Sequence, residues 1–238
     1  MRSNLNYYLR GAPDGLPIPS LGHIALVTGQ PEVDLFFRTG RSAAESIRES
    51  LAKHELKVED FHSILDFGCG CGRVVRYWRD LRSTKIYGVD YNKDLIRWSR
   101  KHLPFVVFKT NALQPSLDFP NESFDFIYAL SVFTHFTEEL QIPWMTELTR
   151  VLRAEGILLI TTHGEYYLDQ LNESERVQFL SGQLVVKGNG QAGSNWLGAY
   201  HPKEYIISKL MNGLDLLSFF PQGAKGNPFQ DMYLLKKI

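Results

Sequence analysis

Short apolar runs alternate with amphipathic segments through most of this chain, and this alternation restricts the possible folds more than any other feature. Runs typical of buried strands occupy residues 63–67, 85–90, 105–110, 124–130 and 156–162. Apolar residues at helical spacing occupy the intervening segments 72–81, 93–103 and 144–154. Because strands that alternate with helices usually form βαβ units, the sequence predicts a mainly parallel sheet with helices on both faces.

The C-terminal part of the chain departs from this alternation. A helix is predicted at 202–211, with Pro202 at its first position and Gly213 ending it. Two strands, 215–220 and 230–237, then follow with only a loop between them, which indicates an antiparallel edge. The predicted fold class is therefore α/β, with a doubly wound, seven-stranded mixed sheet whose last strand is antiparallel.

A chain of 238 residues suits one α/β domain. We expect residues 1–58 to form an irregular segment and a helix that cap this domain, and residues 59–238 to form the domain itself. An insertion at about 164–201 interrupts the alternation. Its second half is rich in glycine and has no clear helix or strand, which is typical of a lid or binding loop.

Two local signals concern helix boundaries. Ser42 and Glu45 have the spacing of a capping box, so a helix should begin at Ser42. Pro143 lies inside the segment 137–152. Because proline lacks a backbone N–H group and clashes with the preceding turn, we expect a short turn at 137–141 and the main helix after it.

Charge and composition exclude some classes of function. Lys+Arg and Asp+Glu both number 26, so the formal net charge is zero, whereas a non-specific nucleic-acid binder normally carries a basic surplus. We therefore expect no nucleic-acid partner. The N-terminus lacks the apolar core of a signal peptide, and no apolar run is long enough to span a bilayer. These features indicate a cytoplasmic protein without a membrane partner; they leave the oligomeric state unknown.

The stretch ILDFGCGCGRV, residues 64–74, joins the first strand to the next segment, at the edge where parallel sheets bind ligands. Its three glycines allow a sharp turn and close approach of a ligand to the backbone. Arg73 stands where a dinucleotide fingerprint needs its third glycine, and the P-loop motif is absent. Asp66, before the first glycine, would repel a pyrophosphate and suits a ligand that carries an ammonium group.

The two cysteines of the chain, Cys69 and Cys71, lie in the same stretch. A structural zinc site needs four ligands, and no histidine pair with the usual spacing lies near this loop. A redox pair usually has the spacing C-x-x-C rather than C-x-C. We therefore predict no metal site and interpret both cysteines as small side chains that fill a crowded turn.

Two polar residues follow the next strands. Asp90 ends the second strand, 24 residues after Asp66, where a carboxylate can accept hydrogen bonds from both hydroxyls of a ribose. The third strand leads to Asn111, which is placed to meet an adenine amino group. A nucleoside that also carries an amino-acid group would use all three polar residues.

Taken in order, these segments resemble the class I S-adenosylmethionine-dependent methyltransferases. LDFGCGCGRV resembles the family's glycine motif, GVDYN its ribose-binding acid, TNALQP its adenine-contacting segment, and SFDFIYALSVFTHF the strand and loop beside cofactor and substrate. The resemblance covers roughly 60–162 strongly and 202–237 by element order. More loosely, the chain resembles small bacterial methyltransferases that modify sugars or other small metabolites.

The resemblance implies a Rossmann-like methyltransferase fold with strand order 3-2-1-4-5-7-6. It implies S-adenosyl-L-methionine as the cofactor and S-adenosyl-L-homocysteine as the product. Asn111 stands where the family commonly has Asp, and its side-chain oxygen can still accept from an adenine amino group. The cofactor-binding residues that the resemblance implies are Asp66, Gly68, Cys69, Gly70, Asp90, Tyr91, Asn111, Ala112 and Leu130.

Methyl transfer requires an acceptor positioned in line with the sulfur–methyl bond, and a hydroxyl acceptor also benefits from a base. His135 and His163 follow the fourth and fifth strands, and His201 precedes the late helix, so these three are candidate bases. The alternative for each histidine is a surface position or a role as a helix cap. The alternative for the rings of Trp196 and Tyr200 is that they pin the insertion to the core. The candidate substrate-binding residues are Phe36, Arg38, Glu165, Trp196 and Tyr200.

The predicted function is S-adenosylmethionine-dependent methylation of a small-molecule acceptor such as a sugar or a phenol, with oxygen favoured over nitrogen. One alternative is a non-catalytic binding module or partner subunit that keeps the fold. Another is an NAD-dependent oxidoreductase, against which Arg73 argues. The sequence does not identify the acceptor.

Overall fold

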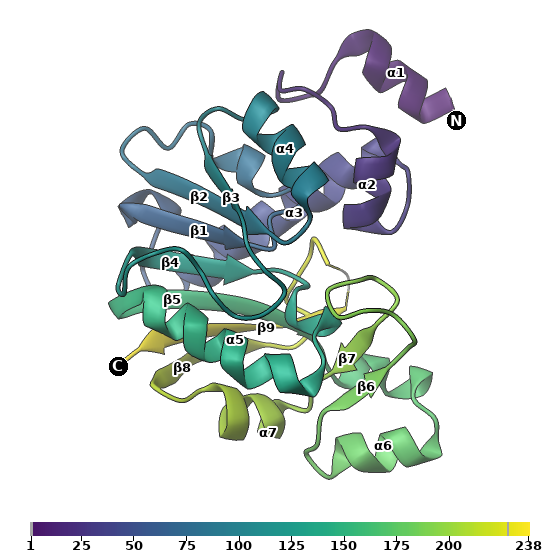
Figure 1. Ribbon diagram of the computed structural model, residues 1–238, viewed down its shortest axis with the longest axis vertical. Helices are drawn as coiled ribbons and strands as arrows, with labels where there is room; N and C mark the ends of the chain where they lie inside the picture. The colour runs from purple at the N-terminus through teal and green to yellow at the C-terminus, as the bar shows by residue number, and fades with distance from the viewer. Residues whose placement is uncertain (1, 228) are drawn as a thin grey trace.

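A computed structural model describes residues 2–227 and 229–238 of the chain. Within these residues the central sheet has the strand order β3-β2-β1-β4-β5-β9-β8 (Figure 1). β9 is antiparallel to both neighbours, and the pairs from β3 to β5 are parallel. This confirms the predicted seven-stranded α/β sheet. The strands are β1 (Ser63–Phe67), β2 (Lys85–Asp90), β3 (Val107–Thr110), β4 (Phe124–Ala129), β5 (Leu152–His163), β8 (Leu214–Phe220) and β9 (Gln230–Lys237).

Helices cover both faces of this sheet (Figure 1). Successive side chains of a strand point to opposite faces, so β4 contributes Phe126 to one apolar core and Ile127 to the other. The first core lies against α3 (Val33–Ala52), the 3-10 turn η2 (Val75–Trp78) and α4 (Lys93–His102). The second lies against α5 (Glu138–Val151), α7 (Lys203–Tyr205) and the π-helical turn η5 (Ile206–Leu210). Pro202 is the N-cap of α7 rather than its first residue.

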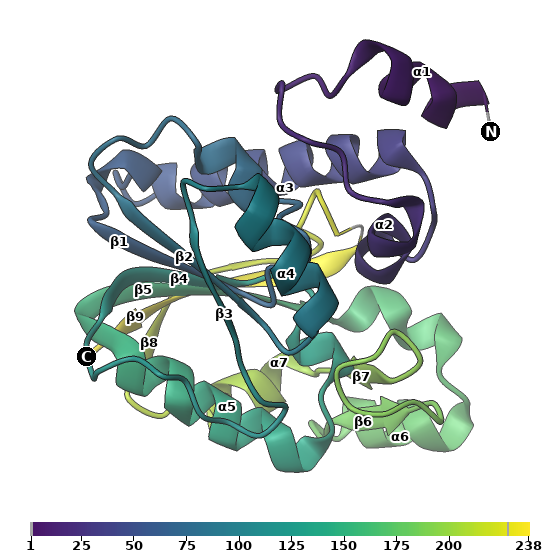
Figure 2. The same cartoon turned by 45° about the horizontal axis from the view of Figure 1, so that its top comes forward.

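The N-terminal segment is helical rather than irregular (Figure 2). Ser20 is the N-cap of helix α2 (Leu21–Thr28), and its Oγ accepts from the His23 N–H at 3.2 Å. The third helix begins well before Ser42, because Val33 and Phe36 extend its buried apolar stripe toward the N-terminus. The predicted helix start at Ser42 is therefore wrong. The two additional helices are α1 (Arg2–Arg10) and α2 (Leu21–Thr28).

Two other helix predictions are wrong. Residues 72–81 form only η2, since Gly72 has a φ of 78° and the buried Arg76 side chain is held by Asp14 of the N-terminal segment. α5 continues through Pro143, so the expected break does not occur. Pro143 lies in the second turn, where its missing N–H removes only one helical hydrogen bond.

The insertion contains elements of its own, contrary to the expectation of a structureless segment. A capping box between Asn172 and Glu175 starts α6, and β7 pairs with the end of β5 where Tyr200 lies opposite His163. The hairpin β6–β7 thus extends the sheet beyond β5. We call residues 188–197, which join β6 to β7, the cover loop. The elements are η4 (Glu165–Gln170), α6 (Glu173–Leu180), β6 (Val185–Lys187) and β7 (Gly198–Tyr200).

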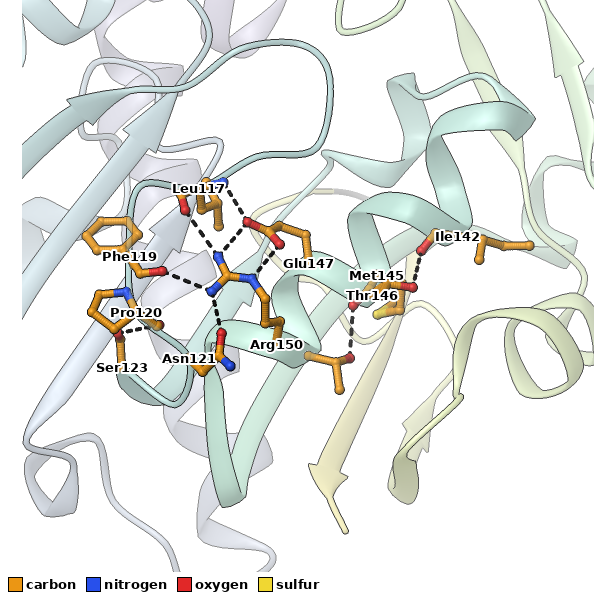
Figure 3. Close-up of polar contacts among 11 residues, drawn as sticks. Leu117, Phe119, Pro120, Asn121, Ser123, Ile142, Met145, Thr146, Glu147 and Arg150 are labelled. Atoms are coloured by element: carbon orange, nitrogen blue, oxygen red, sulfur yellow. Dashed lines mark hydrogen bonds and ion pairs between the residues drawn. The ribbon is translucent and has the colours of Figure 1, made fainter.

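An arginine on α5 fixes the loop that leads from β3 to β4 (Figure 3). The Arg150 guanidinium donates to the carbonyl oxygens of Leu117 and Phe119 and to Asn121 Oδ1, at 2.8–3.1 Å. Glu147 pairs with Arg150 and also accepts from the Leu117 N–H at 2.6 Å. These bonds hold the C-terminal half of the loop that starts at Asn111.

Two 3-10 turns complete the described elements, η1 (Val58–Asp60) before β1 and η3 (Phe133–His135) after β4. No helix in the described part of the chain has both the length and the apolar character needed to cross a membrane.

Candidate active site

A cavity of about 250 Å³ lies at the carboxyl ends of β1, β2 and β4. Ligands bind at this edge in open parallel sheets. Segments from distant parts of the chain form its walls: the glycine loop, the residues after β2, β3 and β4, helix α2 and the cover loop. The lining includes residues 26–27, 66–70, 73–74, 90–92, 111–113, 130–132, 135–136, 193–196 and 227.

The glycine loop requires glycine at positions 68 and 70. Gly68 and Gly70 have φ values of 79° and 54°, in the left-handed region that favours glycine. A Cβ on Gly68 would lie 2.4 Å from Val132 Cγ2, and one on Gly70 would lie 2.7 Å from Val27 Cγ2. The loop is anchored to β2, since the N–H groups of residues 68 and 69 both donate to the Val89 oxygen. The backbone is therefore exposed to the cavity, as the sequence predicts.

Asp90 holds the neighbouring wall in place. Its Oδ2 accepts from the Gly70 N–H at 2.9 Å, and its Oδ1 accepts from the Asn92 N–H at 2.8 Å. Burial raises the pKa of the Asp90 carboxyl above its usual 3.8, and these two hydrogen bonds oppose that shift. Each oxygen keeps a lone pair, because an ionised carboxylate offers about four acceptor positions. The geometry fits a pair of ribose hydroxyls.

Asp66 is a buried carboxyl at the base of the glycine loop. Burial raises its pKa to about 7, an effect that the charge of Asp90 increases and that the Tyr128 hydroxyl and the Arg73 guanidinium oppose. Arg73 is itself buried and donates to the Gly226 oxygen and to Asn227 Oδ1. A ligand ammonium near Asp66 would favour its ionised form, since a nearby opposite charge lowers a carboxyl pKa.

Asn111 and Tyr91 form the far end of the cavity. The Asn111 Nδ2 donates to the Ala112 oxygen at 2.7 Å, whereas its Oδ1 is buried and has no partner. A buried acceptor without a donor is costly, and the amino group of an adenine would supply that donor. The residues present thus fit an adenosine group, with Asp90 at its ribose and Asn111 at its base.

The two cysteines are free and buried. Cys69 lines the cavity, and burial raises its pKa well above the usual value of 9.0. Cys71 packs against the N-terminal helices, and burial raises its pKa to about 12. Both thiols are protonated at neutral pH and are therefore poor nucleophiles and metal ligands.

The cover loop closes the cavity from the side of α2. The Tyr91 hydroxyl donates to the Gly193 oxygen at 2.8 Å, and the Asn195 Nδ2 donates to the Leu26 oxygen at 3.1 Å. Trp196 also lines the cavity, although 82% of its surface is exposed to solvent. Figure 2 shows the loop between β6 and β7 directed toward α2. Segments about 170 residues apart in the chain thus meet over the site.

His135 is the one candidate base that lines this cavity. Its Nδ1 lies 2.8 Å from the Leu197 oxygen. Because a carbonyl oxygen can only accept, Nδ1 carries the proton and Nε2 carries a lone pair. Burial lowers the pKa of His135 below its usual 6.5, and the hydrogen bond to Leu197 partly opposes this shift. The imidazole is therefore neutral at pH 7.

His163 and His201 lie outside the cavity lining. Burial lowers their pKa values to about 4 and about 3, respectively. The His163 ring packs against Tyr167 and Tyr200, and His201 is fully buried with its Nε2 3.1 Å from Gln141 Oε1. The Gln141 oxygen can only accept, so His201 Nε2 is the donor. His201 therefore has the surroundings of a core residue.

The predicted substrate-binding residues separate into two groups. Trp196 lines the cavity, whereas Tyr200 is buried against His163. Phe36 is fully buried in the core formed by the N-terminal helices, and Arg38 is an exposed residue that pairs with Asp34 of its own helix. Neither they nor Glu165 line the cavity. All nine predicted cofactor-binding residues do line it: Asp66, Gly68, Cys69, Gly70, Asp90, Tyr91, Asn111, Ala112 and Leu130.

Several lining residues were missed by sequence reasoning. Leu26 and Val27 lie on α2, a helix that the Pro- and Gly-rich surroundings obscured. Asn227 and Asn195 lie in loops whose positions depend on tertiary contacts. Ser131 directly follows the predicted strand end at 130, and that position was the one available signal.

Comparison with known proteins identifies the type of domain and its fold. Residues 65–160 match the family model described as a methyltransferase domain. Residues 65–160 thus carry a class I S-adenosylmethionine-dependent methyltransferase domain. S-adenosylmethionine is the cofactor of this enzyme class, and the match removes the nicotinamide alternative.

The methyltransferase fold recurs in solved structures of low sequence identity. A SAM-dependent methyltransferase from Methanosarcina mazei aligns with a TM-score of 0.58 and 20% identity, covering 79% of this chain and 97% of that one. An S-adenosylmethionine-dependent methyltransferase from Clostridium acetobutylicum aligns with a TM-score of 0.59 and 14% identity, covering 83% of this chain and 91% of that one. At such identities the likeness extends to the fold alone.

Curated relatives differ in their acceptors. The tRNA N(3)-cytidine methyltransferase METTL2 of Gallus gallus is 28% identical over 171 residues, covering 63% of this chain and 45% of that protein. The malonyl-[acyl-carrier protein] O-methyltransferase of Enterobacter lignolyticus is 26% identical over 121 residues, covering 51% of this chain and 47% of that protein. The chain spans about half the length of these relatives.

Proposed function

We propose that this chain methylates a hydroxyl group of a small-molecule acceptor, with His135 as the general base. The observation that carries the proposal is the hydrogen bond from His135 Nδ1 to the Leu197 oxygen. This bond fixes the tautomer and leaves a basic Nε2 on a residue that lines the cavity. A base held in this state can accept the proton that an attacking hydroxyl must lose.

When bound, S-adenosylmethionine supplies an electrophilic methyl group. Asp90 would hold the two ribose hydroxyls, and the Asn111 oxygen would accept from the adenine amino group. The Asp66 carboxylate would attract the ammonium group of the cofactor. The glycine loop provides the surface on which the amino-acid part can lie, since Gly68 and Gly70 admit no side chain. These residues bind and orient the reactants, and well-oriented reactions gain roughly 7–11 kcal/mol from positioning.

We also propose roles for the two additions to the methyltransferase core. Residues 1–58 would act as a cap, because α2 supplies Leu26 and Val27 to the cavity wall. The insertion at about 164–201 would exclude water from the site, because the cover loop contacts both α2 and Tyr91. Water exclusion strengthens the electrostatic contacts inside a site and prevents hydrolysis.

The test is formation of S-adenosylhomocysteine by the purified chain across a library of phenols, sugars and amines. Wild type, His135→Gln and the control His62→Gln are compared; His62 is an exposed residue that precedes β1 at the opposite edge of the sheet. We expect turnover with a hydroxyl compound that is lost in His135→Gln and kept in the control. Turnover confined to amines, or cofactor binding without turnover on any compound, would contradict the proposal.

A second candidate for the methyl acceptor is a hydroxyl group or a nucleobase carried on an anionic macromolecule. The basic side chains of Lys93, Arg97, Arg100 and Lys101 surround a surface hollow that also includes Thr110. The adjacent residue 111 lines the cofactor cavity. The names of the relatives, which specify a tRNA and an acyl-carrier protein, give this candidate its substrates for testing. Methylation of either one, with a loss in Lys101→Glu, would favour it over a small molecule.

A further inference from the structure

We propose that the acceptor is a planar aromatic ring carrying a hydroxyl group, and that it stacks on the paired rings of Tyr166 and Phe229. This inference rests on the proposed function, since it names the acceptor class of the same site. Tyr166 lies in η4 of the insertion, and Phe229 directly precedes β9.

The first observation is the geometry of the pair. The ring centroids of Tyr166 and Phe229 lie 4.0 Å apart with an interplanar angle of 7°. Both residues are 46% exposed. Aromatic side chains that line a ligand site are usually covered once the ligand is bound. The two rings therefore present a flat aromatic surface to solvent. A third ring can stack on such a surface, a contact worth about 0.5–1.5 kcal/mol beyond its burial.

The second observation is backbone strain. Phe229 has a φ of 64° and Ser131 has a φ of 59°. A bulky residue in the left-handed region is uncommon, and such strain persists where the surrounding structure holds it in place. The Phe229 ring stacks on Tyr166 and is 46% exposed, so this bulky residue in the left-handed region does not lie in the core.

The third observation connects the ring pair to the cofactor cavity. Gln230, next to Phe229, is buried, and its Nε2 donates to Ser131 Oγ at 2.8 Å. Ser131 lines the cavity, and so does Asn227 on the other side of Phe229 along the chain. Neither ring lines the cavity itself; Gln230, through Ser131, and Asn227 connect the ring pair to it. A ring stacked there can direct a substituent toward the cavity that His135 also lines.

The polar groups between the rings and the cavity favour an aromatic acceptor over a sugar. Gln230 Oε1 accepts from Thr161 Oγ1, and its Nε2 is already bound to Ser131, so both ends of the amide are used. Asp231 Oδ1 accepts from the Gln222 N–H. A sugar needs partners for several hydroxyls, because leaving them unpaired is costly. A phenolic ring needs only one or two.

The test uses catechol as the probe and measures its binding by calorimetry in the presence of saturating S-adenosylhomocysteine. Tyr166→Leu keeps an apolar side chain and removes the flat ring. Phe229→Gly removes the other ring and suits the left-handed φ, so the fold is retained. Tyr8→Leu, which changes an exposed tyrosine on α1, is the matched control.

We expect catechol to bind, with affinity reduced roughly 2- to 10-fold in Tyr166→Leu and in Phe229→Gly, and unchanged in Tyr8→Leu. S-adenosylhomocysteine should bind all four proteins equally. If it binds but catechol does not, or if catechol binds all proteins alike, the aromatic site is refuted while the proposed function stands. Preferential binding of methyl glucoside or cytidine at these rings also refutes it. If S-adenosylhomocysteine itself fails to bind, the proposed function fails.

Discussion

Asp90 provides the sharpest test of the cofactor site. In Asp90→Ala we expect the affinity for S-adenosylhomocysteine to fall by about 1–3 kcal/mol, because two ligand hydroxyls lose a charged acceptor. This corresponds to roughly 5- to 150-fold in Kd. The same change leaves the N–H groups of Gly70 and Asn92 without their partner, so the melting temperature should also fall.

Asp90→Asn should have a smaller effect than Asp90→Ala. An amide retains one oxygen, which can still accept from either Gly70 or Asn92, whereas its NH₂ group faces the other N–H as a second donor. One ribose hydroxyl therefore keeps an acceptor. The expected order of affinity is wild type, then Asp90→Asn, then Asp90→Ala.

Isothermal calorimetry with S-adenosylhomocysteine measures this order at a temperature where each variant is folded. The control is Asp94→Ala, which removes an exposed carboxylate four residues away that pairs with Arg97. Its Kd should stay within about twofold of wild type, because exposed ion pairs contribute little. Equal Kd values for wild type and both Asp90 variants would refute the assignment of the ribose site.

Four further outcomes follow from the structure. His135→Gln should lower kcat with a hydroxyl acceptor by roughly 10²–10⁴-fold while cofactor affinity stays constant, and retained kcat would remove the base role. Because burial lowers the pKa of His135, its basic form persists below the usual 6.5, so the acid limb of kcat/KM should lie below pH 6.5; a limb above that value would contradict the lowered pKa. His163 and His201, with pKa values lowered to about 4 and about 3, favour the folded state above pH 6.5 and lose this contribution progressively as pH falls from 6.5 through those values. Urea unfolding between pH 7 and 4.5 should show this decline, with a smaller slope in His201→Leu, and equal slopes would count against it. Trp196→Ala should raise the acceptor's KM and change the unfolding free energy by less than about 0.5 kcal/mol, since the ring is 82% exposed; a loss of several kcal/mol would assign it to packing.

The parts of the fold that the sequence predicted are those governed by local pattern. β9 coincides with the predicted strand at 230–237, and β8 differs by one residue at its start. The cofactor-binding residues that the family resemblance implies all line the cavity, because the short motifs that carry them lie at the carboxyl ends of predicted strands. At such positions the periodicity of the chain alone decides where a side chain lies.

The errors occur where tertiary contacts decide. The segment 72–81 has helical spacing, but the buried ion pair between Arg76 and Asp14 holds it in shorter turns. His201 follows an insertion whose hairpin could not be read, so its burial beside Gln141 was not predictable. Phe36 looked available for a ligand because the start of α3 was placed too late.

The attachments of the cover loop use main-chain atoms to a large extent. The Gly193 N–H donates to the His135 oxygen, the Gly193 oxygen accepts from Tyr91, and the Leu197 oxygen accepts from the His135 ring. Main-chain groups are the same whichever side chains the loop carries. The residues of the loop other than its glycines can therefore change without losing these bonds, and new acceptor preferences can arise at those positions. Gly188 and Gly193 are restricted, since their φ values are 104° and 83°. In the glycine loop the restriction falls on the residues that face the cofactor cavity, Gly68 and Gly70, so variation at this site should be concentrated at the other positions of the cover loop.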